Sequence, residues 1–306
     1  MRRRLGTVLA ALLAGLAALW LVGERGRFLL PSSRRSIRLM GWSGTFSLTA
    51  LHGYVYGRWT RQYMAVLRWL LPRLRPRQSR YLADRYHAKV LTAELARSVI
   101  TLDRDIPLRD LEQVIPYSQA RTLVLSGSPD IAVYECACRL SRTRHCEPTQ
   151  VCLIIGQPFV DFTLDHHPGG ARRLTQNEAL ELLRQEHDRG HVHTAWFKDT
   201  ALNRFYAICN CCDCCCVGME AMIRHGIPVM APSGYLARVE AQRCSGCGTC
   251  WGACPFGAIH ASDGVAQVEW ARCMGCSVCV DRCPTGALIL VRDEAKGIPL
   301  DVRTLA

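Results

Sequence analysis

The chain has 306 residues, of which 18 are cysteine, and it carries a formal net charge of +12. A chain of this length has room for one large or two medium domains with sizeable cores. All 18 cysteines fall in four groups between Cys136 and Cys283, which excludes the disulfide framework of a small secreted protein and indicates metal binding or redox chemistry.

The positive charge is confined to the N-terminal part of the chain. Residues 1–85 contain 16 Arg, no Lys and two acidic residues, a charge of +14, whereas the remainder carries −2. We therefore expect no nucleic-acid partner, because an acidic surface repels the phosphate backbone.

The first predicted element is a membrane anchor at residues 1–24. Three arginines precede residues 5–23, which are 19 uncharged, mostly apolar residues, close to the ~20 that cross a bilayer as a helix. This pattern predicts a single N-terminal transmembrane helix, and a cleaved signal peptide is the alternative. The five arginines that follow by Arg38 outnumber the first three, which places the soluble domains in the cytoplasm. The alternative is export of the folded protein across the membrane through a twin-arginine signal.

Residues 25–80 form a basic, aromatic juxtamembrane segment. Its apolar stretch 39–57 has no formal charge but is interrupted by Gly41, Gly44 and Gly53, and Trp, Tyr and Arg residues surround it. Such residues settle at the headgroup level of a bilayer. We expect an interfacial helix with membrane lipid as a partner, and a re-entrant segment is the alternative.

Residues 81–236 are expected to form a cysteine-rich α+β module. Apolar residues at helical spacing predict helices over 81–102 and 105–114. Runs typical of strands lie at 122–125, 131–134, 151–155, 159–162, 192–197 and 205–208. The clearest helix covers 175–189, because Thr175 and Glu178 form a capping-box pattern and Gly190 follows as a stop signal.

Ten cysteines of this module are candidate ligands of an additional cluster or metal ion. They are Cys136, Cys138, Cys146, Cys152, Cys209, Cys211, Cys212, Cys214, Cys215 and Cys216. Adjacent side chains in so dense a run point in different directions and cannot all pack as small apolar groups. One or two further iron–sulfur clusters, zinc, and a reactive dithiol pair stay open as alternatives. Further candidate metal ligands or proton donors are His166, His167, His191 and His193.

The most specific motif lies in residues 237–292. Two runs share the spacing C-x2-C-x2-C-x3-C-P and stand 29 residues apart. The first run is Cys244, Cys247, Cys250 and Cys254, and the second is Cys273, Cys276, Cys279 and Cys283. Zinc sites pair one C-x-x-C with a distant second pair and need no proline after the fourth cysteine. The spacing therefore indicates two iron–sulfur clusters.

These residues resemble the bacterial-type 2[4Fe–4S] dicluster ferredoxin family. The resemblance implies a pseudo-twofold βαββαβ fold in which the fourth cysteine of each run binds the other cluster. It assigns cluster 1 to Cys244, Cys247, Cys250 and Cys283, and cluster 2 to Cys273, Cys276, Cys279 and Cys254. The upstream pattern around Cys136 and Cys138, together with the dense run, resembles that of uncharacterised bacterial and archaeal ferredoxin-like iron–sulfur proteins. Residues 293–306 are expected to be a C-terminal tail.

No motif for nicotinamide, flavin, nucleoside triphosphate or haem binding occurs in the sequence. The sequence thus predicts an α+β iron–sulfur protein, anchored in a membrane, that transfers single electrons between a redox protein partner and the cysteine-rich module. One alternative is a reductase whose catalytic site is that module. Another is a redox or iron sensor or an assembly protein. No individual catalytic residue is predicted.

Overall fold

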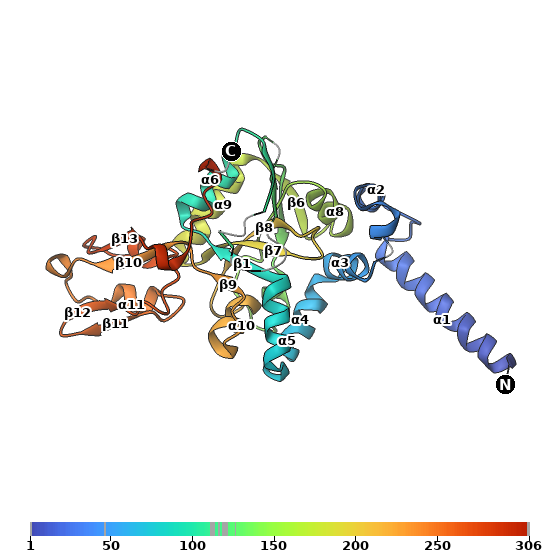
Figure 1. Ribbon diagram of the computed structural model, residues 1–306, viewed down its shortest axis with the longest axis horizontal. Helices are drawn as coiled ribbons and strands as arrows, with labels where there is room; N and C mark the ends of the chain where they lie inside the picture. The colour runs from blue at the N-terminus through green and yellow to red at the C-terminus, as the bar shows by residue number, and fades with distance from the viewer. Residues whose placement is uncertain are drawn as a thin grey trace.

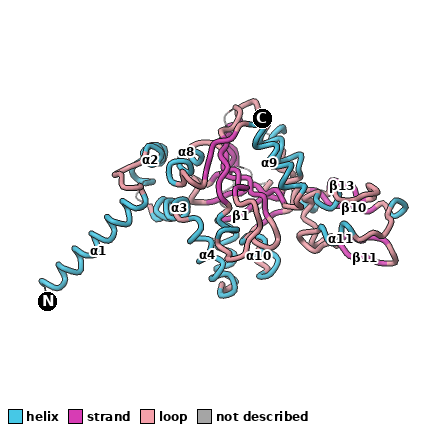
Figure 2. The backbone as a smooth tube through the Cα atoms, turned by 180° about the vertical axis from the view of Figure 1, so that it is seen from behind, coloured by secondary structure: helices cyan, strands magenta, loops and turns pink. Residues whose placement is uncertain are grey.

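The computed structural model describes residues 2–45, 47–110, 114–115, 117, 122–125 and 127–304. The molecule has a central sheet with helices on both sides, a long N-terminal helix that projects outward at one end, and a small C-terminal domain at the opposite end (Figure 1). The same arrangement is seen from behind in Figure 2, where the strands of the central sheet run through the middle of the molecule.

The N-terminal part is helical and is attached to the body of the protein. Its helices are α1 (Arg2–Gly23), α2 (Pro31–Thr45), α3 (Leu48–Arg58) and α4 (Thr60–Leu70), followed by the 3-10 helix η1 (Leu71–Arg73). The Nε of Arg58 donates to the carbonyl of Gly23 at 2.9 Å, and the ring of Trp20 stacks on Tyr54 with centroids 5.3 Å apart. These contacts hold the C-terminal end of α1 against α3.

The predicted transmembrane helix is wrong. Helix α1 contains the arginines at positions 2–4, and among the described residues no helix is long and apolar enough to cross a bilayer. The structure therefore does not support a single N-terminal span. It also does not support the location that was predicted from this span, in which the soluble domains lie in the cytoplasm. The expected fold class is corrected accordingly, to a mixed α/β fold without a transmembrane helix in the described part of the chain.

The described strands of the cysteine-rich module form one mixed sheet. Its main path has the order β6-β4-β5-β8-β7-β1-β9, while β3 joins the start of β8 and pairs with β2. The bounds are β1 (Tyr86–Val90), β2 (Ile106–Asp110), β3 (Thr122–Leu125), β4 (Ile131–Glu135), β5 (Gln150–Ile155), β6 (Ala171–Leu174), β7 (Val192–Lys198), β8 (Arg204–Cys211) and β9 (Met230–Ala231). The pairs β7–β8 and β4–β5 are antiparallel. Buried side chains on the two faces of the sheet form two separate cores.

Helices cover both faces of this sheet (Figure 1). They are α5 (Pro76–Arg85), α6 (Ala93–Ile100), α7 (Ala137–Leu140), α8 (Phe159–His166), α9 (Gln176–Asp188) and α10 (Val217–His225). The predicted helix 175–189 is confirmed, with both halves of the Thr175 and Glu178 capping box present. The strands expected at 122–125, 131–134, 151–155, 192–197 and 205–208 are confirmed as well.

Three local expectations fail. The helix predicted over 81–102 is interrupted by β1, whose five residues are all buried between neighbouring strands; tertiary pairing therefore overrides the helical spacing. Residues 106–110 form β2 rather than a helix, while residues 111–113 lie outside the described part. Residues 159–162 open helix α8 rather than forming a strand, because a short apolar run does not distinguish the two.

The C-terminal domain follows the order β10 (Tyr235–Val239), α11 (Thr249–Ala253), β11 (Ile259–Ser262), β12 (Val265–Val268), α12 (Val278–Asp281) and β13 (Leu288–Arg292). Strand β10 pairs with β13 and β11 with β12, both antiparallel. The 3-10 helices η2 (Ala241–Arg243), η3 (Glu294–Lys296) and η4 (Val302–Thr304) complete the fold. The hydroxyl of Ser233 donates to the carbonyl of Gly275 at 2.7 Å, and His187 Nε2 lies 2.7 Å from Asp281 Oδ2. The domain is thereby docked on the central module.

Candidate iron–sulfur and metal sites

The first group of ferredoxin-type cysteines surrounds a small cavity. Cys244, Cys247, Cys250 and Cys283 all line this cavity of about 30 Å³ between α11, β11 and the loop before β13. The N–H of Ala287 donates to the Sγ of Cys283 at 3.2 Å, and the N–H of Ala266 to the Sγ of Cys244 at 3.5 Å. Thiolate ligands supported by backbone N–H groups suit an iron–sulfur cluster.

The second group is more deeply buried. Cys273, Cys276 and Cys279 are 7 to 8% exposed, and the charges of Cys254 and Cys273 act on both Cys276 and Cys279. Burial raises the pKa of the Cys276 thiol to about 12, and binding of a metal to such a thiol releases its proton. The structure thus brings the fourth cysteine of each run beside the three of the other run. The assignment of ligands to two clusters stays a prediction.

Two tight turns shape the loops that carry these cysteines. Gly246 has a φ of +67° and Gly275 a φ of +64°, and residues other than glycine rarely adopt a backbone conformation in this region. A Cβ on Gly275 would lie 2.2 Å from the Tyr235 carbonyl oxygen, and one on Gly246 would lie 2.5 Å from the carbonyl oxygen of Gly264. Glycine is therefore required at both positions, and the residues present fit the iron–sulfur clusters that the spacing implies.

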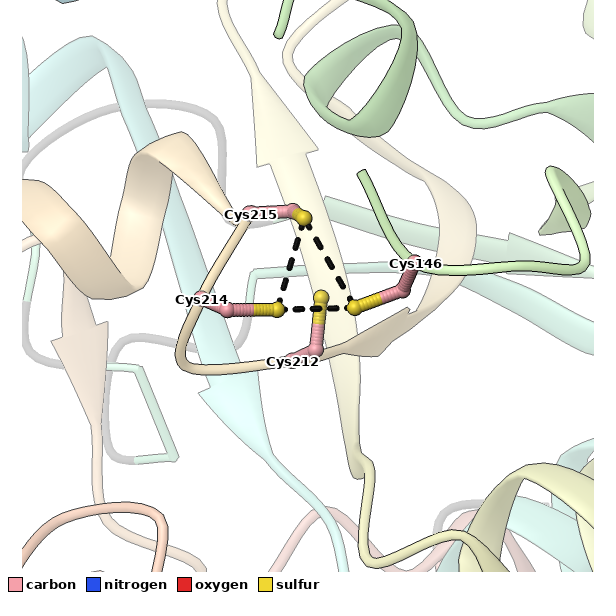
Figure 3. A group of neighbouring side chains, drawn as sticks. All are labelled: Cys146, Cys212, Cys214 and Cys215. Atoms are coloured by element: carbon pink, nitrogen blue, oxygen red, sulfur yellow. Dashed lines mark hydrogen bonds between the residues drawn. The ribbon is translucent and has the colours of Figure 1, made fainter. Parts of the chain in front are cut away.

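The ten upstream cysteines separate into two groups, which sequence reasoning did not resolve. Four of them, Cys146, Cys212, Cys214 and Cys215, have Sγ atoms that all lie within 4.8 Å of one another (Figure 3). Cys146 comes from the loop between α7 and β5, and the others come from the loop between β8 and α10. We call these residues the four-cysteine group.

The remaining six form a continuous row of sulfurs. They are Cys136, Cys138, Cys152, Cys209, Cys211 and Cys216, and we call them the six-cysteine group. The thiols of Cys136 and Cys138, Cys136 and Cys152, Cys152 and Cys209, and Cys138 and Cys216 lie close enough for each to shift the pKa of its neighbour. The Sγ atoms of Cys216 and Cys211 lie 3.3 Å apart. The neighbouring Cys138 thiol and burial raise the pKa of the Cys136 thiol to about 12, although Cys152 acts in the opposite direction.

Strand geometry explains why neighbouring cysteines belong to different groups. Successive side chains of a strand point to opposite faces of the sheet. Cys209 and Cys211 on β8 therefore share one face, where they join the six-cysteine group. Cys212 follows at the end of the strand and points the other way, into the four-cysteine group. The dense run thus serves two sites rather than one.

A cavity of about 490 Å³ lies over the six-cysteine group and is lined by all six of its members. The tyrosines on its wall are Tyr54, Tyr56, Tyr86, Tyr134 and Tyr206. The hydroxyls of Tyr56 and Tyr206 lie 2.7 Å apart, and burial raises the pKa of Tyr134 to about 12. Sequence reasoning missed this cavity, since no local pattern links tyrosines from α3, β1, β4 and β8.

The four candidate histidines have other partners. His191 Nδ1 lies 2.7 Å from Glu186 Oε2, and His193 Nδ1 lies 2.6 Å from the Oδ1 of Asn210. His167 Nε2 contacts the carbonyl of Gly57 at 2.7 Å, and His166 lies beside Glu24. Among the described residues, only one set of cysteine, histidine or carboxylate side chains lies close enough together to hold a metal ion. That set is the four-cysteine group, and no histidine belongs to it.

Comparison with known proteins agrees with the C-terminal site. Residues 243–288 match the family model of the 4Fe-4S dicluster domain. No curated protein matches the chain. This match and the clustered cysteines show that the protein binds iron–sulfur clusters, and they indicate iron–sulfur electron transfer as its chemistry.

Proposed function

We propose that the protein is an electron carrier in which single electrons pass from a redox protein partner, through two [4Fe–4S] clusters, to a further cluster held by the six-cysteine group. Each cluster accepts one electron from its neighbour and is reoxidised when it passes that electron on, and a second redox partner accepts the electron from the upstream cluster. The dicluster cysteines Cys244 and Cys247 are partly or fully exposed, which suits electron entry from a partner at that end of the molecule.

The observation that carries this proposal is the continuity of the protein core between the two sites. Cys276 of the second ferredoxin run, with Met274 and Val278, belongs to the same buried apolar core as Cys211 and Cys216. The second ferredoxin run therefore packs into the same core as two cysteines of the six-cysteine group. A closely packed path of this kind suits transfer between redox centres.

The experiment compares reduction of the upstream site in two variants of the full chain, purified without oxygen. After rapid reduction by a light-activated donor, electron paramagnetic resonance follows the dicluster and upstream signals separately. Cys273→Ser removes a ligand of the buried cluster and is expected to slow reduction of the upstream site strongly. Ser262→Ala, at a half-buried position at the end of β11, is the control and should leave the rate unchanged. Equal upstream rates in wild type and Cys273→Ser would refute the relay.

The cavity favours a second candidate function, reduction of a small, largely apolar molecule at the six-cysteine group. Its volume of about 490 Å³ lies within the ~300 to 1,000 Å³ of ligand pockets. The partner protein would supply two electrons one at a time, and solvent would supply the protons. An added thiol or cyanide that shifts the upstream spectrum would support this function, because it requires an open coordination position. If neither ligand binds, this second function is refuted and electron transfer stays as the proposed function.

A further inference from the structure

The four-cysteine group has the geometry of a site for one metal ion. The Sγ of Cys146 lies 2.8 Å from that of Cys214 and 3.7 Å from that of Cys215, and the Sγ atoms of Cys214 and Cys215 are 3.4 Å apart. Together with Cys212 the four sulfurs surround one point (Figure 3). Four thiolates at ~2.3 Å from a tetrahedral zinc ion lie roughly 3.8 Å from one another.

A four-iron cluster needs a wider arrangement. Its four thiolates bind four different iron corners, so each sulfur lies outside its own corner and further from the others than sulfurs that share one ion. All Sγ pairs of the four-cysteine group lie within 4.8 Å. The separations therefore fit a single ion better than a cube.

The surroundings also fit a closed, negatively charged thiolate site. Four thiolates around a divalent ion leave a net charge of −2 and no open position, which is typical of structural zinc. The guanidinium of Arg68 donates to the carbonyl of Cys215 at 2.6 Å, and the positive charge of Arg139 acts on Cys212. Both arginines also pair with carboxylates, Arg68 with Glu220 and Arg139 with Glu186, so the positive charge that they bring to the site is shared with these partners.

We propose that Cys146, Cys212, Cys214 and Cys215 bind one zinc ion that is separate from the iron–sulfur chemistry of the chain. The ion joins the loop between α7 and β5 to the loop between β8 and α10. That second loop begins after Cys211 and ends at Cys216, two members of the six-cysteine group. The zinc ion consequently holds the loop that positions those two sulfurs.

The test measures zinc, iron and acid-labile sulfide in the full chain, purified without oxygen. Wild type is expected to contain about one zinc per chain. Cys214→Ser, at an exposed position, is expected to lose this zinc. Cys136→Ser in the six-cysteine group is the matched control and is expected to keep it.

Two further measurements test the proposal even if Cys214→Ser folds poorly. Co²⁺ loaded in place of zinc should show the intense visible bands of tetrahedral thiolate coordination in wild type. Cys214→His keeps four ligands and should retain the metal with shifted bands. Wild-type protein without zinc, or a loss of iron and sulfide rather than zinc from Cys214→Ser, would overturn the proposal. Neither result bears on electron transfer through the dicluster domain.

Discussion

Arg139 and Glu186 form an ion pair with no solvent exposure, in which Nη2 of the arginine lies 2.9 Å from Oε2 of the carboxylate. Glu186 also contacts His191 at 2.7 Å and Arg189 at 2.7 Å. Arg139 follows Cys138 on α7, and Glu186 lies on α9. The pair therefore joins the segment that carries two cysteines of the six-cysteine group to the helix that covers the sheet.

Glu186→Gln is expected to destabilise the protein. Removing one partner leaves the Arg139 charge buried without its counter-ion, and breaking a buried pair costs about 3 to 5 kcal/mol. Denaturant unfolding of the anaerobic protein measures the change. The control is Glu181→Gln on the same helix, whose pair with Arg184 is exposed and should be nearly neutral. Equal stabilities of the two variants would argue against a structural role for the buried pair.

Cys244→Ser and Cys273→Ser are each expected to lose one cluster, or about four of eight irons in the C-terminal domain. Because both clusters share one small core, each variant should also hold its other cluster less firmly. Iron and sulfide content, with the number of electron spins after reduction, measures both effects. Full iron content in both variants would contradict the cluster assignment.

Gly275→Ala is expected to weaken the docking of the C-terminal domain and binding of the buried cluster. The added Cβ would lie 2.2 Å from the Tyr235 carbonyl oxygen at a φ of +64, so the loop must move, at a cost of roughly 1 to 3 kcal/mol. A lower melting temperature and a faster loss of iron should result. Gly252→Ala is the control, because nothing lies within 4 Å of its Cβ position. Similar behaviour of the two variants would show that the close approach is not needed.

Lys89→Met is expected to stabilise the protein most at low pH. Lys89 is 1% exposed, its ammonium donates to the carbonyl of Val114 at 3.1 Å, and burial, with the charge of Arg292, lowers its pKa to about 7.

Between pH 7 and the ordinary lysine pKa of ~10.4 the unfolded chain binds more protons than the folded one. Wild-type stability therefore rises with pH in this window, and below pH 7 the full cost of the buried charge is present. The advantage of Lys89→Met should shrink by up to about 1.4 kcal/mol per pH unit above pH 7. Paired denaturation curves at pH 6, 8 and 9 measure it. A difference independent of pH would show that Lys89 is not the titrating group.

Much of the local structure could be read from the sequence. The helix at 175–189 follows from its capping residues, which act within one turn. Residues 86–90 show the limit of such reasoning, because their helical spacing is overridden by pairing with β7 and β9. The expected membrane span also failed, because among the described residues no helix is both long enough and apolar enough to cross a bilayer.

The chemistry of the C-terminal domain can be read from the sequence alone, because the cysteines of each run lie a few residues apart and their spacing is a local property. The division of the ten upstream cysteines into two groups follows from the folded arrangement of the chain and from no pattern in the sequence. Cys146 reaches its partner Cys214 across 68 positions of chain, and the alternating faces of β8 send Cys211 and Cys212 to different sites. Such contacts between distant segments depend on strand pairing and packing, and these cannot be predicted from the local spacing of cysteines.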